Sequence, residues 1–104
     1  MEEIEVDALA ELRAACAPQV LDVREDWEVA ICSLPDSCHI PLGQLMTRVS
    51  ELDRGRPLVV VCHHGVRSRA AQGWLLSQGF ARVVNMAGGI DAYARHVDPT
   101  MATY

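Results

Sequence analysis

The run Leu58–Val61 constrains the fold of this chain more than any other segment. Its residues are all apolar, three of them are β-branched, and the polar turn residues 53–57 come directly before it. A strand with apolar side chains on both faces must be covered on both sides, as parallel strands are when helices pack above and below them. The run therefore predicts a buried strand at the centre of an α/β fold.

Weaker patterns on either side of this run alternate between strand and helix. Short apolar segments of strand type lie at 4–6, 20–23, 38–40 and 81–86. Apolar residues with helical spacing lie at 8–15, 25–31, 44–52, 68–78 and 90–95, and Asp7 is the expected N-cap of the first of these helices. This alternation predicts a three-layer α/β domain, with a central parallel sheet of about five strands flanked by helices. At 104 residues the chain has room for one domain, 1–104.

The charge and the apolar content of the chain exclude several classes of protein. All 9 basic residues are arginine against 14 acidic residues, and the net charge of −5 is unlike that of a nucleic-acid-binding domain. The absence of lysine excludes Schiff-base chemistry. The longest apolar run, 58–62, is too short to cross a bilayer, so we expect no membrane partner and a cytoplasmic location.

Three of the four cysteines stand outside any motif. Cysteine is too rare here for a secreted disulfide scaffold, so we expect all four to be thiols. The sequence leaves the roles of Cys16, Cys32 and Cys38 open, and a structural or incidental role is the simplest interpretation.

Cys62 differs because it ends the predicted central strand and begins the segment CHHGVRS. This place, between a strand and a helix start, is where open α/β sheets bind ligands. Backbone amides of 63–67 and the helix N-terminus would favour the thiolate, Arg67 could hold an oxyanion in bidentate fashion, and Ser68 offers a hydroxyl. A small buried hydrophobic residue, the alternative role for Cys62, needs none of these partners. We therefore expect a nucleophilic Cys62 and a substrate-binding loop of His63, His64, Gly65, Val66, Arg67 and Ser68.

Two further features surround this loop. Asp22 and Arg24 follow an expected strand and are predicted to pair and brace the wall of the loop, or to cap the strand end. His63 and His64 are adjacent, and neighbouring side chains do not easily converge on one ion. We therefore expect no metal and no cofactor, and we expect the histidines to add positive charge at the rim of the site.

The sequence also resembles the rhodanese family of thiosulfate sulfurtransferases. The active-site loop of that family reads Cys, two variable residues, Gly, one variable residue, Arg and Ser, and residues 62–68 match it. The resemblance extends to an early LDVR segment at 21–24, a HIP-type stretch at 39–42, and closing GF and NxxGGI segments at 79–80 and 85–90. Tyr93 stands where the family often has Trp, and 36–39 departs from its usual Gly-His-Ile-Pro.

The resemblance implies a rhodanese-like fold and sulfur transfer. A small anionic donor such as thiosulfate would load Cys62 with sulfur, and cyanide, a thiol or a protein would accept it. The segment 28–35 is similar to one in rhodanese domains of proteins that activate sulfur carriers, which keeps a sulfur-carrier acceptor open.

Two other functions fit parts of the sequence. A rhodanese-like domain can act as a binding or regulatory module without turnover, although inactive copies usually lose the cysteine that is kept here as Cys62. Dual-specificity phosphatases and arsenate reductases share the build, but phosphatase loops place five residues between Cys and Arg. Only four separate Cys62 from Arg67, so we expect a ring of amides that suits a single sulfur atom better than a phosphoryl group.

Overall fold

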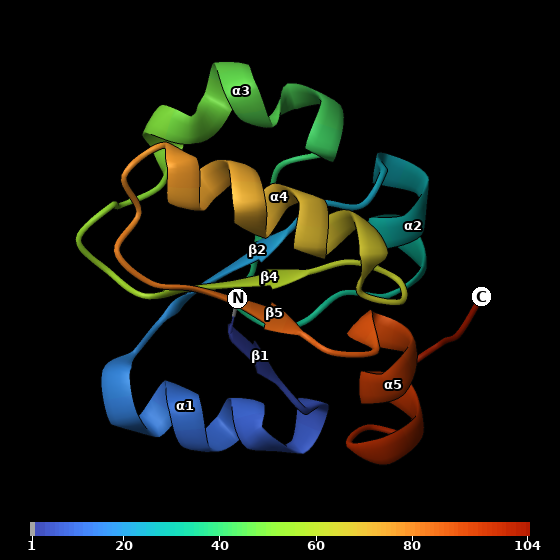
Figure 1. Ribbon diagram of the computed structural model, residues 1–104. Coiled ribbons are helices and arrows are strands. Elements are labelled where there is room, and N and C mark those ends of the chain that lie inside the picture. The colour runs from blue at the N-terminus through green and yellow to red at the C-terminus, as the bar shows by residue number, and fades with distance from the viewer. Residues whose placement is uncertain (1) are drawn as a thin grey trace.

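A five-stranded, fully parallel sheet forms the centre of the molecule (Figure 1). The computed structural model describes residues 2–104. The strands are β1 (Glu2–Ile4), β2 (Gln19–Asp22), β3 (Cys38–His39), β4 (Leu58–Val61) and β5 (Val83–Met86), in the spatial order β1-β5-β4-β2-β3. The predicted α/β fold with about five parallel strands is confirmed, and the run Leu58–Val61 is its middle strand.

Helices cover both faces of the sheet. They are α1 (Leu9–Cys16), α2 (Asp26–Ile31), α3 (Leu45–Arg48), α4 (Val66–Ser77) and α5 (Gly89–His96). In Figure 1, α3 and α4 lie above the sheet and α1 and α5 lie below it. None of the helices described in residues 2–104 combines the length and apolar character that crossing a bilayer requires.

The strand β4 supplies both halves of the core. Leu58 and Val60 pack with the helices on one face, while Val59 and Val61 pack with those on the other, and all four are fully buried. Burying one such side chain contributes about 1.5–3 kcal/mol. Because the side chains of β4 are apolar on both faces, the strand is buried between two helical layers.

The prediction of one continuous helix over 44–52 is wrong. The segment forms a 3-10 turn (Leu42–Gln44), the short helix α3, and a second 3-10 turn (Val49–Glu51). The Thr47 hydroxyl donates to the Gln44 carbonyl, a local bond that competes with regular helix geometry. Met46 is one of the apolar residues with helical spacing in this segment, yet it is 73% exposed.

Helix ends also differ from the prediction in one place. Asp7 is not an N-cap, because it lies inside a 3-10 turn (Val6–Ala8) and α1 follows without a side-chain cap. The cap that does form is at α2, where Glu25 and Glu28 make a capping box. This box sets the start of α2 beside the carboxyl end of β2.

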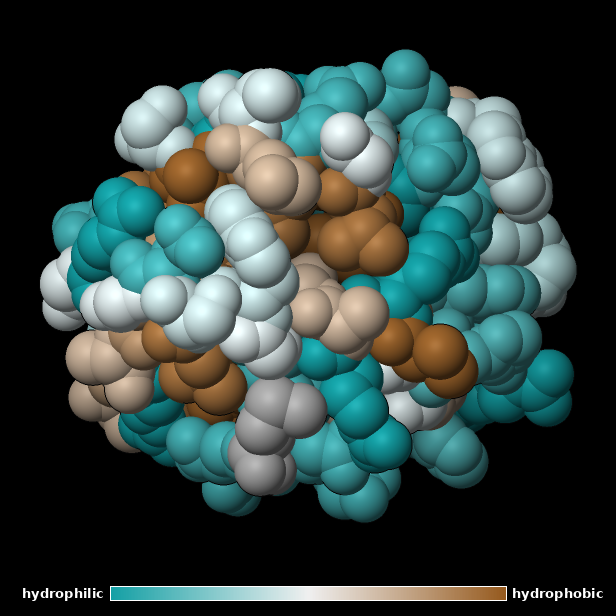
Figure 2. All heavy atoms as spheres, turned by 45° about the horizontal axis from the view of Figure 1, so that its top comes forward, coloured by the Kyte–Doolittle hydropathy of each residue, from teal (hydrophilic) through white to brown (hydrophobic). Residues whose placement is uncertain are grey.

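The surface over α3 and α4 mixes apolar and hydrophilic side chains (Figure 2). The exposed large apolar residues of these two helices are Met46, Val66 and Leu76. Leu76 is the least exposed of the three, at 36%. Single exposed apolar residues are normal on protein surfaces and indicate no site by themselves.

Candidate active site

Cys62 lies at the carboxyl end of the middle strand, where the chain turns into α4. Its side chain is buried, and its Sγ accepts a hydrogen bond of 2.9 Å from the Gly65 amide. Gly65 has φ +103°, in the left-handed region that favours glycine, and it caps the start of α4. The glycine of the loop therefore turns one backbone amide onto the sulfur.

Ser68 and Asn85 form the next layer around the sulfur. The Ser68 Oγ lies 3.3 Å from the Cys62 Sγ, and the Ser68 hydroxyl donates to Asn85 Oδ1. Asn85 Nδ2 donates to the Gly65 carbonyl and to Glu3, which fixes the orientation of the amide. Because the Ser68 hydroxyl donates its hydrogen bond to Asn85, the Ser68 oxygen is free to accept a hydrogen bond from the Cys62 thiol. The sequence placed Asn85 only in a closing motif and not at the site.

The N-terminal turn of α5 holds the outer side of the loop. The amides of Ile90 and Asp91 donate to the carbonyls of Cys62 and His63, at 2.8 and 3.1 Å. Gly89 allows this approach, because a Cβ atom there would lie 2.3 Å from the Cys62 carbonyl oxygen. With these two carbonyls bound by α5, the loop is held where the Gly65 amide donates to the sulfur.

Arg67 makes a bidentate ion pair inside the protein. Its two terminal nitrogens lie 2.6 and 2.8 Å from the carboxylate oxygens of Glu28 on α2. The Glu28 side chain is 4% exposed, whereas 35% of the Arg67 side chain is exposed. Both terminal nitrogens of Arg67 are therefore already bound to Glu28, and an anion that binds Arg67 must share the guanidinium with this carboxylate.

Asp22 and Arg24 belong to the same polar network. They form a buried ion pair of 2.6 Å, and Arg24 also donates to the Tyr104 hydroxyl at 3.0 Å. The Tyr104 hydroxyl in turn donates to Glu28 at 2.7 Å. The network therefore runs from the end of β2 to Arg67, through Glu28 and Tyr104, which the sequence patterns did not indicate as site residues.

Ionisation in this network follows from its pairing. The hydrogen bonds from Arg67 lower the pKa of Glu28 to about 2, against an opposing effect of burial. Burial raises the pKa of Tyr104 to about 12. The pairing with Glu28 raises the pKa of Arg67. All of these groups keep one charge state throughout the neutral range.

Replacing Glu28 with glutamine should flatten the acid limb of the stability curve. The folded pKa of Glu28, about 2, is below its ordinary value of 4.5, so this carboxylate stabilises the fold above about pH 4.5 and loses that effect as the pH falls toward 2. The shift corresponds to about 3 kcal/mol. Urea unfolding at several pH values between about 5 and 2 measures it.

The matched control is Glu11→Gln, which changes an exposed acid on α1. Its acid limb should follow that of the wild type. An equally steep acid limb in Glu28→Gln would show that the Arg67 pair does not contribute to stability as the geometry indicates.

The two histidines of the loop lie at its rim. The His63 ring stacks on Tyr104 with centroids 3.9 Å apart, and His64 lies on the other side of His63 at 4.0 Å. Burial lowers the pKa of His63, and the neighbouring His64 adds to the effect. Val66, the remaining expected contact of the loop, is 78% exposed. Of the expected loop residues, Gly65 and Ser68 contact the buried sulfur, whereas His64 and Val66 are exposed.

Comparison with known proteins agrees with this geometry. Residues 5–96 match the family described as "Rhodanese-like domain", and the chain belongs to that family. It is 38% identical over 102 residues to a sulfurtransferase of Allochromatium vinosum, covering 96% of this chain and 94% of that protein. A rhodanese-related protein of Thermoplasma volcanium has the same fold, with a TM-score of 0.85 and 33% identity, covering 93% and 94% of the two chains.

A much longer relative is also named as a sulfurtransferase. The chain is 36% identical over 101 residues to the adenylyltransferase and sulfurtransferase MOCS3 of Arabidopsis thaliana, covering 82% of this chain and 22% of that protein. Homology of the chain thus supports sulfur transfer in general.

Proposed function

We propose that this protein carries sulfane sulfur as a persulfide of Cys62. A small anionic donor such as thiosulfate supplies the sulfur, and a thiophilic acceptor removes it. The observation that carries the proposal is the buried Sγ at the end of β4, which accepts a bond from the Gly65 amide within a loop that also bears Arg67. A cysteine needed only for packing would require neither.

The first half of the cycle transfers one sulfur atom. The Cys62 thiolate attacks the outer sulfur of thiosulfate, a new S–S bond forms, and the S–S bond of the donor breaks. Sulfite leaves with the electron pair of that bond, toward the Arg67 guanidinium, which also pairs with the Glu28 carboxylate. The Gly65 amide and the other loop residues bind the donor and then hold the outer sulfur, and Asp22 and Arg24 support the loop through the Tyr104 network.

The second half restores the thiolate. Cyanide or a thiolate attacks the outer sulfur, the S–S bond of the persulfide breaks, and its electron pair returns to Cys62. No cofactor takes part. The similarity of 28–35 to domains of sulfur-carrier-activating proteins makes a protein acceptor a second candidate for this step. All four cysteines are unpaired thiols, which fits the reducing cytoplasm we propose as the location.

The length of the loop favours sulfur over phosphate. Four residues separate Cys62 from Arg67, one fewer than in the phosphatase loops. The shorter ring draws the amides toward the sulfur and crowds the three equatorial oxygens of a phosphoryl group. We therefore place the phosphatase function well below sulfur transfer.

Mass spectrometry of the intact protein tests the proposal. Thiosulfate should add the mass of one sulfur atom, on the peptide that contains Cys62, and cyanide should remove it and release thiocyanate. An activated aryl phosphate assayed in parallel should be hydrolysed negligibly. No gain in mass would favour the binding-module alternative, and faster hydrolysis of the aryl phosphate than transfer of sulfur would favour the phosphatase.

A further inference from the structure

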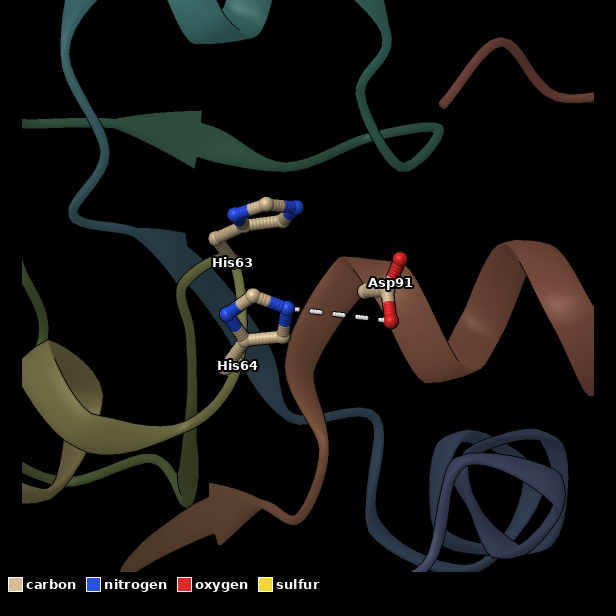
Figure 3. Close-up of side chains that lie close together, drawn as sticks. All are labelled: His63, His64 and Asp91. Atoms are coloured by element: carbon tan, nitrogen blue, oxygen red, sulfur yellow. Dashed lines mark ion pairs between the residues drawn. The ribbon is translucent and has the colours of Figure 1, made fainter. Parts of the chain in front are cut away.

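We propose that His63, His64 and Asp91 form a binding site for a divalent transition-metal ion, with zinc as the preferred ion. One ligand atom from each of these residues lies within 4.8 Å of the other two. Figure 3 shows each imidazole turning one ring nitrogen toward the side of α5 that carries the Asp91 carboxylate. This proximity is the observation that stands against the expectation from sequence that two adjacent histidines do not easily converge on one ion.

The tight loop explains why the histidines lie together. In an extended strand, successive side chains point to opposite faces, but His63 and His64 lie in the turn between β4 and α4. Their rings are tilted by 31° with centroids 4.0 Å apart. Tyr104 stacks on the far side of His63 at 3.9 Å and 12°, so His63 is the ligand held in place before an ion arrives.

The third ligand is positioned by the backbone. Asp91 lies in the first turn of α5, and its amide donates to the His63 carbonyl at 3.1 Å, which fixes the two residues relative to each other. Asp91 Oδ2 lies 3.7 Å from His64 Nε2 and accepts a bond from Arg95 at 3.1 Å. A carboxylate has two oxygens, so it can bind Arg95 and an ion together.

Two imidazoles and a carboxylate are a typical ligand set for zinc. With Zn–N bonds of 2.0–2.1 Å and tetrahedral angles, the ligand atoms would lie about 3.3 Å apart. The separations of up to 4.8 Å must therefore shrink by up to about 1.5 Å. The His64 side chain is 63% exposed and can rotate to close the site. Three protein ligands leave a fourth position for water or another small ligand.

The nucleophile proposed above, Cys62, is not one of the ligands of this site, but His63 and His64 belong to the loop that is proposed to bind the sulfur donor. An ion bound here would therefore affect the same loop. The Ile90 and Asp91 amides already bind the loop to α5 by hydrogen bonds. An ion coordinated by the three side chains would link the loop and α5 a second time. Metal binding should therefore raise the thermal stability of the folded protein.

Titration of the full-length Cys62→Ser variant with cobalt(II) tests the proposal without interference from the nucleophile or from turnover. We expect one equivalent to bind, with visible absorption bands of a tetrahedral site, and zinc to displace it. His64→Gln and Asp91→Asn, each made in this background, should weaken binding at least about 100-fold. His96→Gln, which changes an exposed histidine at the other end of α5, should bind as tightly as the parent. Zinc should raise the unfolding temperature of the parent and of His96→Gln, but not of His64→Gln.

Three results would overturn the proposal. The first is the absence of saturable binding below millimolar cobalt or zinc. The second is unchanged affinity in both His64→Gln and Asp91→Asn, with circular dichroism showing that both are folded. The third is an equal loss of affinity in His96→Gln, which would indicate adventitious binding to surface histidines. None of them bears on the sulfur loading of Cys62, which is measured in the wild type without metal.

Discussion

The Cys62→Ser variant should lose sulfur transfer by at least about a thousandfold, because a hydroxyl cannot replace the thiolate as an acceptor of sulfane sulfur. Its fold should survive, since serine is close in size and can accept the Gly65 amide bond that Sγ accepts now. Thiocyanate formation from thiosulfate and cyanide measures the activity, and the unfolding temperature checks the fold.

The matched control replaces the other three cysteines together, as Cys16→Ser, Cys32→Ser and Cys38→Ser. These side chains are only partly buried, and none of them begins a loop like that of residues 62–68. The triple variant should therefore keep activity within severalfold of the wild type. Transfer at the wild-type rate in Cys62→Ser, or its disappearance only in the triple variant, would contradict the assignment of the nucleophile.

Gly89→Ala should be among the most destabilising substitutions in the chain. The new Cβ would lie 2.3 Å from the Cys62 carbonyl oxygen and 2.5 Å from that of His63, so α5 must move away from the loop. Two backbone bonds from α5 to the loop would weaken as well. We expect a loss of at least about 3 kcal/mol and a fall in the unfolding temperature of at least about 10 °C.

Gly79→Ala separates this clash from ordinary backbone strain. Gly79 has φ +93°, in the same left-handed region as Gly89 at +62°, but an added Cβ there would meet no atom within 4 Å. It should therefore cost only about 1 kcal/mol. Thermal unfolding of the two variants gives the comparison. Equal losses at both positions would mean that contact with the loop carbonyls does not limit α5.

Local pattern was enough to predict the layers of this fold. Leu58–Val61 predicts its own burial, because four consecutive apolar residues leave no face for water. The position of Cys62 follows from that strand. Local pattern failed at 44–52, where the helical spacing is present but a short segment depends on side-chain bonds such as that of Thr47.

The polar surroundings of Cys62 depend on contacts between distant segments, which the sequence does not display. Arg67 carries no sign that its partner is Glu28, 39 residues earlier, and Tyr104 lies in a tail without a pattern. A buried acid must have a partner, but the sequence does not say which one. The approach of His64 to Asp91 likewise needs the packing of α5 on the loop.

The position of β5 has a consequence for the order in which the chain can fold. Because β5 lies between β1 and β4, the strand β1 has no neighbour in the sheet until residues 83–86 have been synthesised. Glu28 can meet Arg67 before that point, but its contact with Tyr104 spans 76 residues and forms only when Tyr104 is available. A nascent chain emerging from the ribosome can pair β2 with β4 early, but β1 must wait for β5, and the bond from Tyr104 to Glu28 forms only after Tyr104 has been synthesised. The polar network that joins Arg24, Tyr104, Glu28 and Arg67 is therefore expected to become complete late in folding, after the middle of the sheet.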